Sequence, residues 1–176
     1  MRLLVAVAVL FAAPAFSQTT VSLNGGYVDF DLSGVGQTAI ADVRANHPLN
    51  RFVALEGGLG FSSTDQQYGQ VSYLLPGGEV QFSVPLGRVR PHLGVGLGLL
   101  VPVTDPGEQT FGSGSTYTID YDPYTLFAAT AAVGLDVGVA GPWVVRTAGR
   151  LRATGADAFE FSGTFAELTA GVGYRF

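Results

Sequence analysis

The sequence contains no cysteine and no lysine, and it has only two histidines. Without cysteine the chain has no disulfides and no thiolate metal sites. With two histidines, the chain has few candidate ligands for a metal centre and few candidate bases to activate a nucleophile. The nine bases are all arginine and are outnumbered by fourteen acids, so nucleic acid, which needs clustered bases, is not an expected partner.

Long apolar runs are also missing, apart from one at the start of the chain. Met1-Arg2 precedes an apolar run of eleven residues, Leu3 to Ala13, and small-x-small cleavage sites follow around Ala15. A spanning helix needs about 18 residues or more, so a secretory signal peptide is favoured over a buried helix or an anchor. We expect residues 1–17 to be removed and residues 18–176 to form one domain.

The last sixteen residues show what is present instead. From Ala166 to Phe176 the even positions are apolar and the odd positions are charged, small or glycine. Such alternation is typical of a strand with one apolar and one polar face. Two charges and two glycines on the polar face, with aromatics ending the apolar face, favour a transmembrane barrel strand with lipid outside and a polar lumen.

The same alternation recurs in eight segments of the chain. Short connections follow the second, fourth and sixth segments, and longer ones follow the others, as in outer-membrane barrels with short periplasmic turns. The sequence therefore predicts an all-β fold, an eight-stranded antiparallel up-and-down transmembrane β-barrel. Within the fourth segment, Pro76-Gly77-Gly78 predicts a bulge or kink. The predicted strands are about Val21–Asp29, Thr38–Asn46, Phe52–Ser62, Gln70–Pro85, Arg90–Val103, Tyr124–Val139, Trp143–Ala153 and Phe161–Phe176.

Two motifs carry a family resemblance across nearly the whole mature chain. They are Arg88-x-Arg90-Pro91-His92-Leu93-Gly94-x-Gly96-x-Gly98 and the ending Gly171-Val172-Gly173-Tyr174-Arg175-Phe176. With the eight alternating strands, they resemble the outer-membrane β-barrel family that includes OmpX-type proteins and the OmpA membrane domain. The resemblance implies that the barrel-assembly machinery recognises the last strand through Val172, Tyr174 and Phe176.

The charged residues are distributed unevenly over the predicted barrel. Residues 18–176 hold eight arginines and fourteen acids, a formal net charge of −6. Arg51 and Arg88 fall at periplasmic turns, and nine acids but no base fall at the external end. No charge falls on the predicted lipid face, where arginine at mid-bilayer costs about 2–4 kcal/mol. The predicted lumen charge network is Asp42, Arg44, Glu56, Glu79, Arg90, Asp136, Arg146, Arg150, Arg152, Glu167 and Arg175.

A narrow lumen requires these charges to be paired, because an eight-stranded barrel is only wide enough to be filled by side chains. Aromatic residues near both ends predict interfacial girdles, which argues against a soluble lipocalin-type barrel. The expected girdle residues are Trp143, Tyr174 and Phe176 at the periplasmic end and Tyr27, Phe61, Tyr73 and Phe127 at the external end.

These features predict a structural or surface-interaction role at the cell envelope, with a narrow channel for ions or small solutes as the alternative. A lipid-modifying enzyme is disfavoured, because neither His47 nor His92 has a suitable serine beside it. Asp120-x-Asp122 falls far short of a calcium motif. We expect no cofactor, no bound metal, a monomer, and contact with outer-membrane lipid and lipopolysaccharide.

Overall fold

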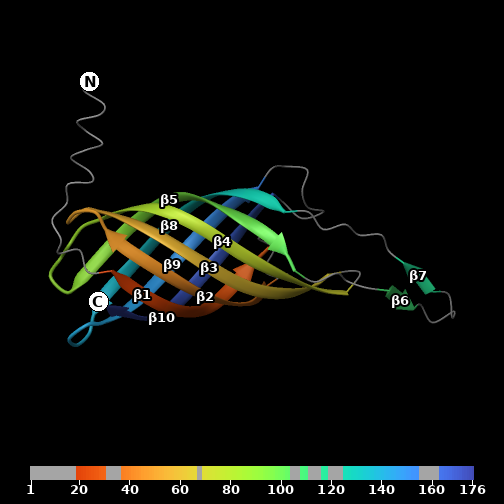
Figure 1. Ribbon diagram of the computed structural model, residues 1–176, viewed down its shortest axis with the longest axis horizontal. Coiled ribbons are helices and arrows are strands. Elements are labelled where there is room, and N and C mark those ends of the chain that lie inside the picture. Colours follow the sequence, from red (N-terminus) through yellow and green to blue (C-terminus); the bar gives the residue numbers. More distant parts are fainter. Residues whose placement is uncertain are drawn as a thin grey trace, which may run out of the picture.

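The computed structural model describes residues 19–30, 37–66, 69–103, 108–110, 116–118, 125–154 and 163–176. Eight antiparallel strands close into one barrel, in the order β1-β10-β9-β8-β5-β4-β3-β2 (Figure 1). No helix in these ranges is long and apolar enough to cross a membrane. The strands are β1 (Thr20–Asp29), β2 (Gln37–Pro48), β3 (Val53–Gln66), β4 (Gly69–Ser83), β5 (Val89–Pro102), β8 (Leu126–Gly138), β9 (Trp143–Thr154) and β10 (Thr164–Arg175).

The predicted fold class is confirmed, and each predicted strand overlaps one strand of the barrel. A separate hairpin was not predicted. It consists of β6 (Glu108–Thr110) and β7 (Thr116–Thr118), within the longer connection, Thr104 to Pro123, that follows the fifth predicted strand. Three-residue strands are too short for alternation to reveal them. Figure 1 shows this hairpin beyond the barrel end that is opposite the termini.

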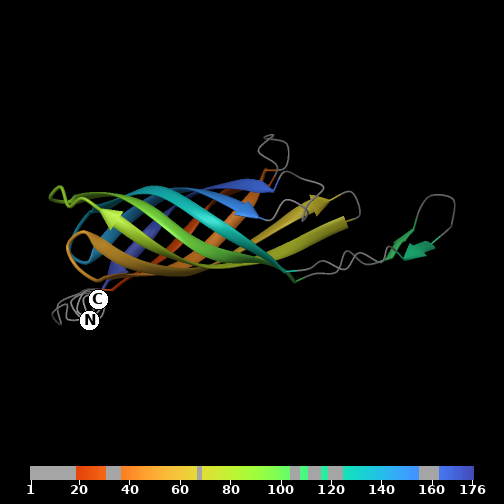
Figure 2. The ribbon, with the colours of Figure 1, turned by 90° about the horizontal axis from the view of Figure 1, so that it is seen from above.

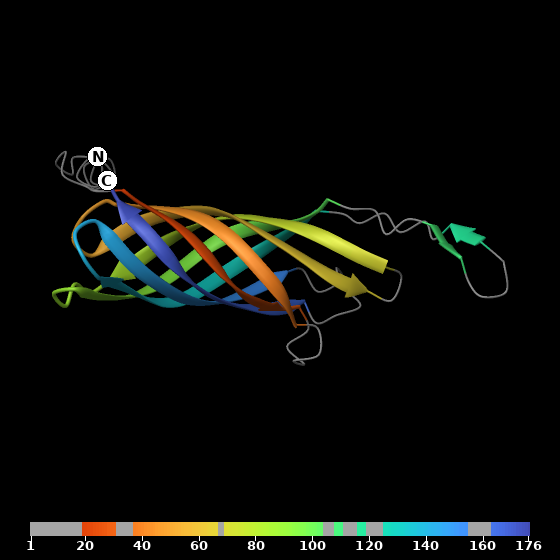
Figure 3. The same ribbon diagram turned by 90° about the horizontal axis from the view of Figure 1, so that it is seen from below.

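The barrel closes where the first strand meets the last. β1 pairs with β10 along its whole length, from Thr20 opposite Arg175 to Asp29 opposite Ala166. In Figure 3 the blue β10 lies beside the red β1, and the start of β1 and the C-terminus lie at one end of the barrel. Closure leaves no unpaired sheet edge, which is the condition for a β-structure to stand in lipid.

Side chains alternate strictly between the interior and the exterior. On β9, Leu151 is 53% exposed, whereas the next residue, Arg152, is 2% exposed. The predicted outward and inward faces of all eight strands agree with the burial of their described residues, apart from the start of β4. The exterior therefore offers leucine, valine and phenylalanine where a bilayer would lie, and the polar groups face the lumen.

Tight turns join the strands at the end that carries the termini (Figure 2). Gly87 and Gly141 have φ angles of +67° and +53°, in the left-handed region that glycine tolerates. They lie in the short connections that the sequence predicts after the fourth and sixth segments. The end with short turns is the periplasmic end of such a barrel, and the opposite end is the external one.

Of the bulge or kink predicted at Pro76-Gly77-Gly78, the bulge is wrong. β4 pairs with β3 without a break, with Leu59 opposite Pro76 and Gly58 opposite Gly77. Its register with β5 is also the same before and after Pro76. Proline has no amide proton to donate. Pro76 therefore interrupts the hydrogen bonds between β4 and β5, but no extra residue is inserted.

Close contact between neighbouring strands requires glycine at particular inward positions. A Cβ on Gly96 of β5 would collide with the carbonyl oxygen of Gly78 on β4. No flexible side chain could move aside there, because the obstructing atom belongs to the backbone. At the outward Gly57 of β3, nothing lies within 4 Å of the point that a Cβ would occupy.

We predict that Gly96→Ala destabilises the barrel by about 1–3 kcal/mol or prevents refolding, because β4 and β5 must separate. Gly57→Ala is the matched control and should change stability by less than about 0.5 kcal/mol. Urea unfolding of refolded protein, with gel migration before and after boiling, measures both effects. Equal stability of the two variants would contradict the close strand contact.

Candidate functional site

A network of paired charges fills the middle of the lumen. It contains nine of the eleven residues predicted for it, four arginines and five acids, all on inward positions. Arg90 and Arg175 are not part of it. The members are Asp42, Arg44, Glu56, Glu79, Asp136, Arg146, Arg150, Arg152 and Glu167.

Two carboxylates of like charge lie next to each other in this network. Glu56 of β3 and Glu79 of β4 are direct register partners. Arg150, on β9, donates to both, with Nη2 3.0 Å from Glu56 Oε1 and Nε 2.8 Å from Glu79 Oε1. β9 and β3 lie four strands apart in a ring of eight. The Arg150 side chain therefore spans the lumen and holds two carboxylates that would otherwise repel each other.

Arg146 makes a second link across the lumen. Its Nη2 lies 2.7 Å from Glu56 Oε2, and its Nε donates to Asp136 Oδ1 at 2.8 Å. One guanidinium thus joins β9 to the opposite wall and to its neighbour β8. The planar fork of arginine makes such double engagement geometrically favourable.

Glu167 of β10 is the third centre of the network. Arg152 Nε donates to it at 2.8 Å, Arg44 Nη2 at 3.1 Å, and Arg150 Nη1 at 3.4 Å. Arg44 is also 3.0 Å from Asp42 on its own strand. These carboxylates and guanidinium groups are almost fully buried, so each buried charge has the partners that its burial demands.

Neutral polar residues extend the network, and the charge-based prediction did not include them. Asn24 donates to Asp42, and Asn46 donates to Gln81 at 2.8 Å and towards Glu56 at 3.4 Å. Their inward positions in the alternation are the signal that would have found them. His92 is also buried there, and neither ring nitrogen has a hydrogen-bond partner within the described residues; Nδ1 lies 3.9 Å from Asp136.

Nearer the external end the lumen is apolar, which the sequence analysis did not predict. Tyr73 is 3% exposed and packs inside the barrel, so its assignment to the outer girdle is wrong. Because β4 has no bulge, its alternation places odd residues inward throughout. The ring of Phe30 contacts those of Tyr73 and Phe165, both at 5.5 Å between centroids. The whole cluster is Val28, Phe30, Ile40, Tyr73, Leu75, Leu100 and Phe165.

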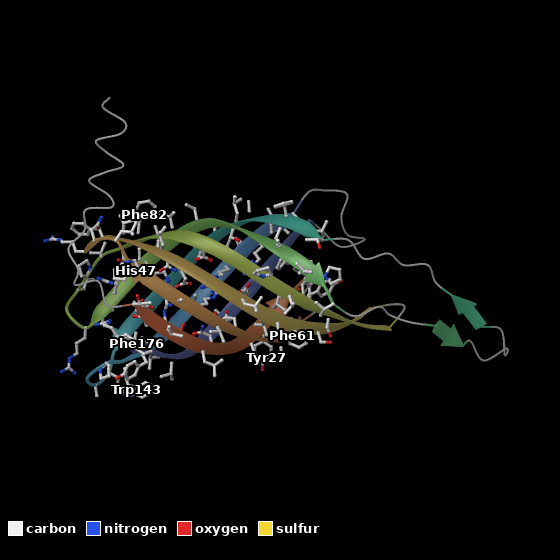
Figure 4. The ribbon with its side chains drawn as sticks, viewed as in Figure 1. Tyr27, His47, Phe61, Phe82, Trp143 and Phe176 are labelled. Carbon is white, nitrogen blue, oxygen red and sulfur yellow. The ribbon has the colours of Figure 1, made fainter. Side chains whose placement is uncertain are left out.

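The other girdle residues lie on the outside, as predicted. Figure 4 shows Trp143 and Phe176 near the end with the termini and Tyr27 and Phe61 towards the opposite end. Trp143, Tyr174 and Phe176 contact one another edge to face, with centroids 5.2 and 4.9 Å apart. Two aromatic belts at different heights are typical of a barrel that crosses a bilayer.

A cavity of about 590 Å³ opens at the periplasmic end, below the charge network. Arg90 and Arg175 line it, together with Arg51 and Arg88 from the turns. Above it, the space among Asn24, Arg44 and Arg146 is only about 10 Å³, which is at most the volume of a single water position. The cavity is thus a vestibule that ends at the charge network.

The described residues bring together no group of three or more histidines and carboxylates that could hold a metal. Asp120-x-Asp122 lies outside the described residues. His47 is exposed at the periplasmic end, where its Nδ1 lies 3.0 Å from the Thr19 hydroxyl. Among the residues that the structure describes, His92 has no hydroxyl hydrogen-bonded to it.

Comparison with known proteins agrees with this geometry. The family described as "Outer membrane protein beta-barrel domain" matches residues 3–176. The chain belongs to this family. The resemblance inferred from the sequence is therefore confirmed, and outer-membrane location follows from the family. A search of curated protein sequences found no significant match.

Solved structures share the fold of this outer-membrane barrel at low sequence identity. Neisserial surface protein A is 15% identical with a TM-score of 0.65, covering 91% of this chain and 97% of that one. OprG of Pseudomonas aeruginosa is 11% identical with a TM-score of 0.65, at 91% and 96% coverage. The N-terminal barrel of Pseudomonas aeruginosa OprF is 15% identical with a TM-score of 0.57, at 91% and 97%.

We predict that Arg150→Met destabilises this outer-membrane barrel by about 3–5 kcal/mol, because Glu56 and Glu79 lose the cation that they share. Adding Glu79→Gln should recover part of the loss, since the two effects are coupled. Arg88→Met, in an exposed turn, is the control and should cost less than about 0.5 kcal/mol. Urea titration in lipid vesicles measures all three; a loss below about 1 kcal/mol for Arg150→Met would indicate a hydrated lumen.

Proposed function

We propose that this protein is a monomeric, non-conducting outer-membrane barrel that serves the cell envelope as a structural or surface-interaction protein. One observation carries the proposal: the lumen is filled at two successive levels, by the charge network and by the apolar cluster. A solute would have to pass both.

The two levels resist passage for different reasons. Arg146 and Arg150 reach from β9 to the opposite strand β3, so moving either aside breaks several ion pairs at once. The cluster around Phe30 and Phe165 offers nothing to a hydrated ion. Removing the water from an ion inside this apolar cluster would cost much free energy. The ion pairs of the charge network would not offset that cost.

Partners would then bind at the external end, where a rigid scaffold carries long loops that tolerate changes of sequence. The sequence places the longest of these loops at Thr104 to Pro123 and Thr154 to Gly163, and the β6–β7 hairpin lies within the first. One protein of similar fold is named a surface protein, which favours this role by analogy only.

Outer-membrane lipid and lipopolysaccharide would surround such a barrel. Residues 1–17, which lie outside the described residues, would direct export as a signal peptide and be removed from the mature protein. Val172, Tyr174 and Phe176 lie on the exterior of the barrel wall at β10, where the barrel-assembly machinery could read them. We assign no catalytic role to the chain; an altered acyl pattern of lipid A on overexpression would contradict this.

We predict that refolded protein gives no steady conductance steps in planar bilayers, because both lumen levels are filled. Arg150→Gly with Glu56→Gly, which removes the link between β9 and β3, serves as a comparison if it refolds. Reproducible steps from the unaltered protein would overturn the non-conducting proposal and favour a narrow channel for ions or small solutes.

We predict that Phe176→Ala lowers the amount of folded barrel in the outer membrane severalfold but leaves refolding in detergent unchanged. The reason is that its side chain is 70% exposed on the exterior and supports no interior contact. Phe127→Ala, another outward aromatic at 78% exposure, is the control and should assemble normally. Equal loss for both variants would indicate a general lipid effect rather than a recognition signal.

A further inference from the structure

The vestibule at the periplasmic end is surrounded by arginine. Four of them line it: Arg51 from the β2–β3 turn, Arg88 from the β4–β5 turn, Arg90 from β5 and Arg175 from β10. They come from three separate parts of the sequence, because Arg88 and Arg90 lie two residues apart, and the closed barrel brings these parts together.

None of these arginines forms an ion pair with a residue in the described ranges. Arg51 lies over the ring of Phe52, 4.3 Å from its centroid. Asp136 is the only acid among the described residues that lines the vestibule, and its carboxylate already accepts a hydrogen bond from Arg146 at 2.8 Å. Four arginines and one engaged carboxylate leave the wall with a formal surplus of three positive charges.

This contrasts with the lumen above, where four arginines meet five acids and every charge is paired. Residues 18–176 contain eight arginines in all; half of them are paired inside the network, and the other half are among the residues that line the vestibule. A concave wall with charges of one sign concentrates the electrostatic field and raises the local concentration of counter-ions.

We propose that the vestibule is a binding site for a phosphate-bearing anion. Arginine presents a planar fork that binds two oxygens of one phosphate. A phosphate monoester carries about −1.5 to −2 charges and three acceptor oxygens, which suits a cavity lined by several arginines better than the single charge of a carboxylate does. The volume of about 590 Å³ lies within the range of small-molecule sites. The proposal is independent of whether the lumen conducts.

Two sources could supply this chemistry: a free phosphate compound in the adjoining aqueous phase, or the headgroup of a phospholipid at the rim. The test uses the full barrel refolded in a detergent with an uncharged headgroup. Inorganic phosphate is titrated calorimetrically at constant ionic strength, with sodium chloride as the blank. In parallel, thermal stability is compared between nanodiscs of phosphatidylcholine and nanodiscs that also contain phosphatidylglycerol.

The deciding variant is Arg90→Met with Arg175→Met, and Arg51→Met with Arg88→Met is a second pair should the first not refold. Arg90→Lys with Arg175→Lys is the matched control, because it keeps the charge and removes the fork. Saturable heat with phosphate that weakens at least about tenfold in the methionine pair, and by an intermediate factor in the lysine pair, supports a free-phosphate site.

Stabilisation by phosphatidylglycerol that disappears in the methionine pair, without heat from phosphate, supports the same site with a lipid headgroup as its ligand. Neither effect in the unaltered protein, or effects of equal size in the methionine variant, would overturn the proposal and leave the four arginines as solvated surface charges. Bilayer recording has no bearing on these outcomes, so the failure of one proposal is distinguishable from failure of the other.

Discussion

The structure depends on Arg150 reaching across the lumen to two adjacent carboxylates. Strand register forces Glu56 and Glu79 together, and in a buried, narrow interior two unshared negative charges would push apart the strands that carry them. A cation from the opposite wall turns this repulsion into a bond between β9 and the β3–β4 pair. The same side chains that satisfy each other also occupy the middle of the lumen, so its charged contents and the stability of the barrel depend on one set of contacts.

Most of the fold could be predicted from the sequence because a barrel in lipid has a severe alternation rule. A one-residue slip in β9 would place Arg146, Arg150 and Arg152 in hydrocarbon, so the face of each strand is fixed by its charges. Strand boundaries and the short turns at Gly87 and Gly141 followed from the same pattern. The β6–β7 hairpin could not be predicted, because three residues carry no period.

The contents of the lumen were only partly predictable. Alternation shows that a side chain points inward, but it does not show at which height it lies or what stands opposite. The prediction of an evenly polar lumen therefore missed the cluster around Phe30, and the expected bulge at Pro76 misplaced Tyr73 on the outside. Likewise, Arg90 and Arg175 were grouped with the network although they lie below it, since sequence distance says nothing about height along a tilted strand.

Asp136 marks the boundary between two electrostatic regions of one cylinder. Its carboxylate lines the vestibule and also accepts a hydrogen bond from Arg146, so it belongs to both. Above it, burial makes pairing compulsory, and every arginine there has a carboxylate. Below it, water reaches the wall, so pairing is optional and folding alone does not require arginines to face one another. Four of them nevertheless line one cavity, in a chain that uses no lysine at all. A requirement for charge alone would be met by either base, whereas a requirement for planar, two-pronged contact is met only by arginine.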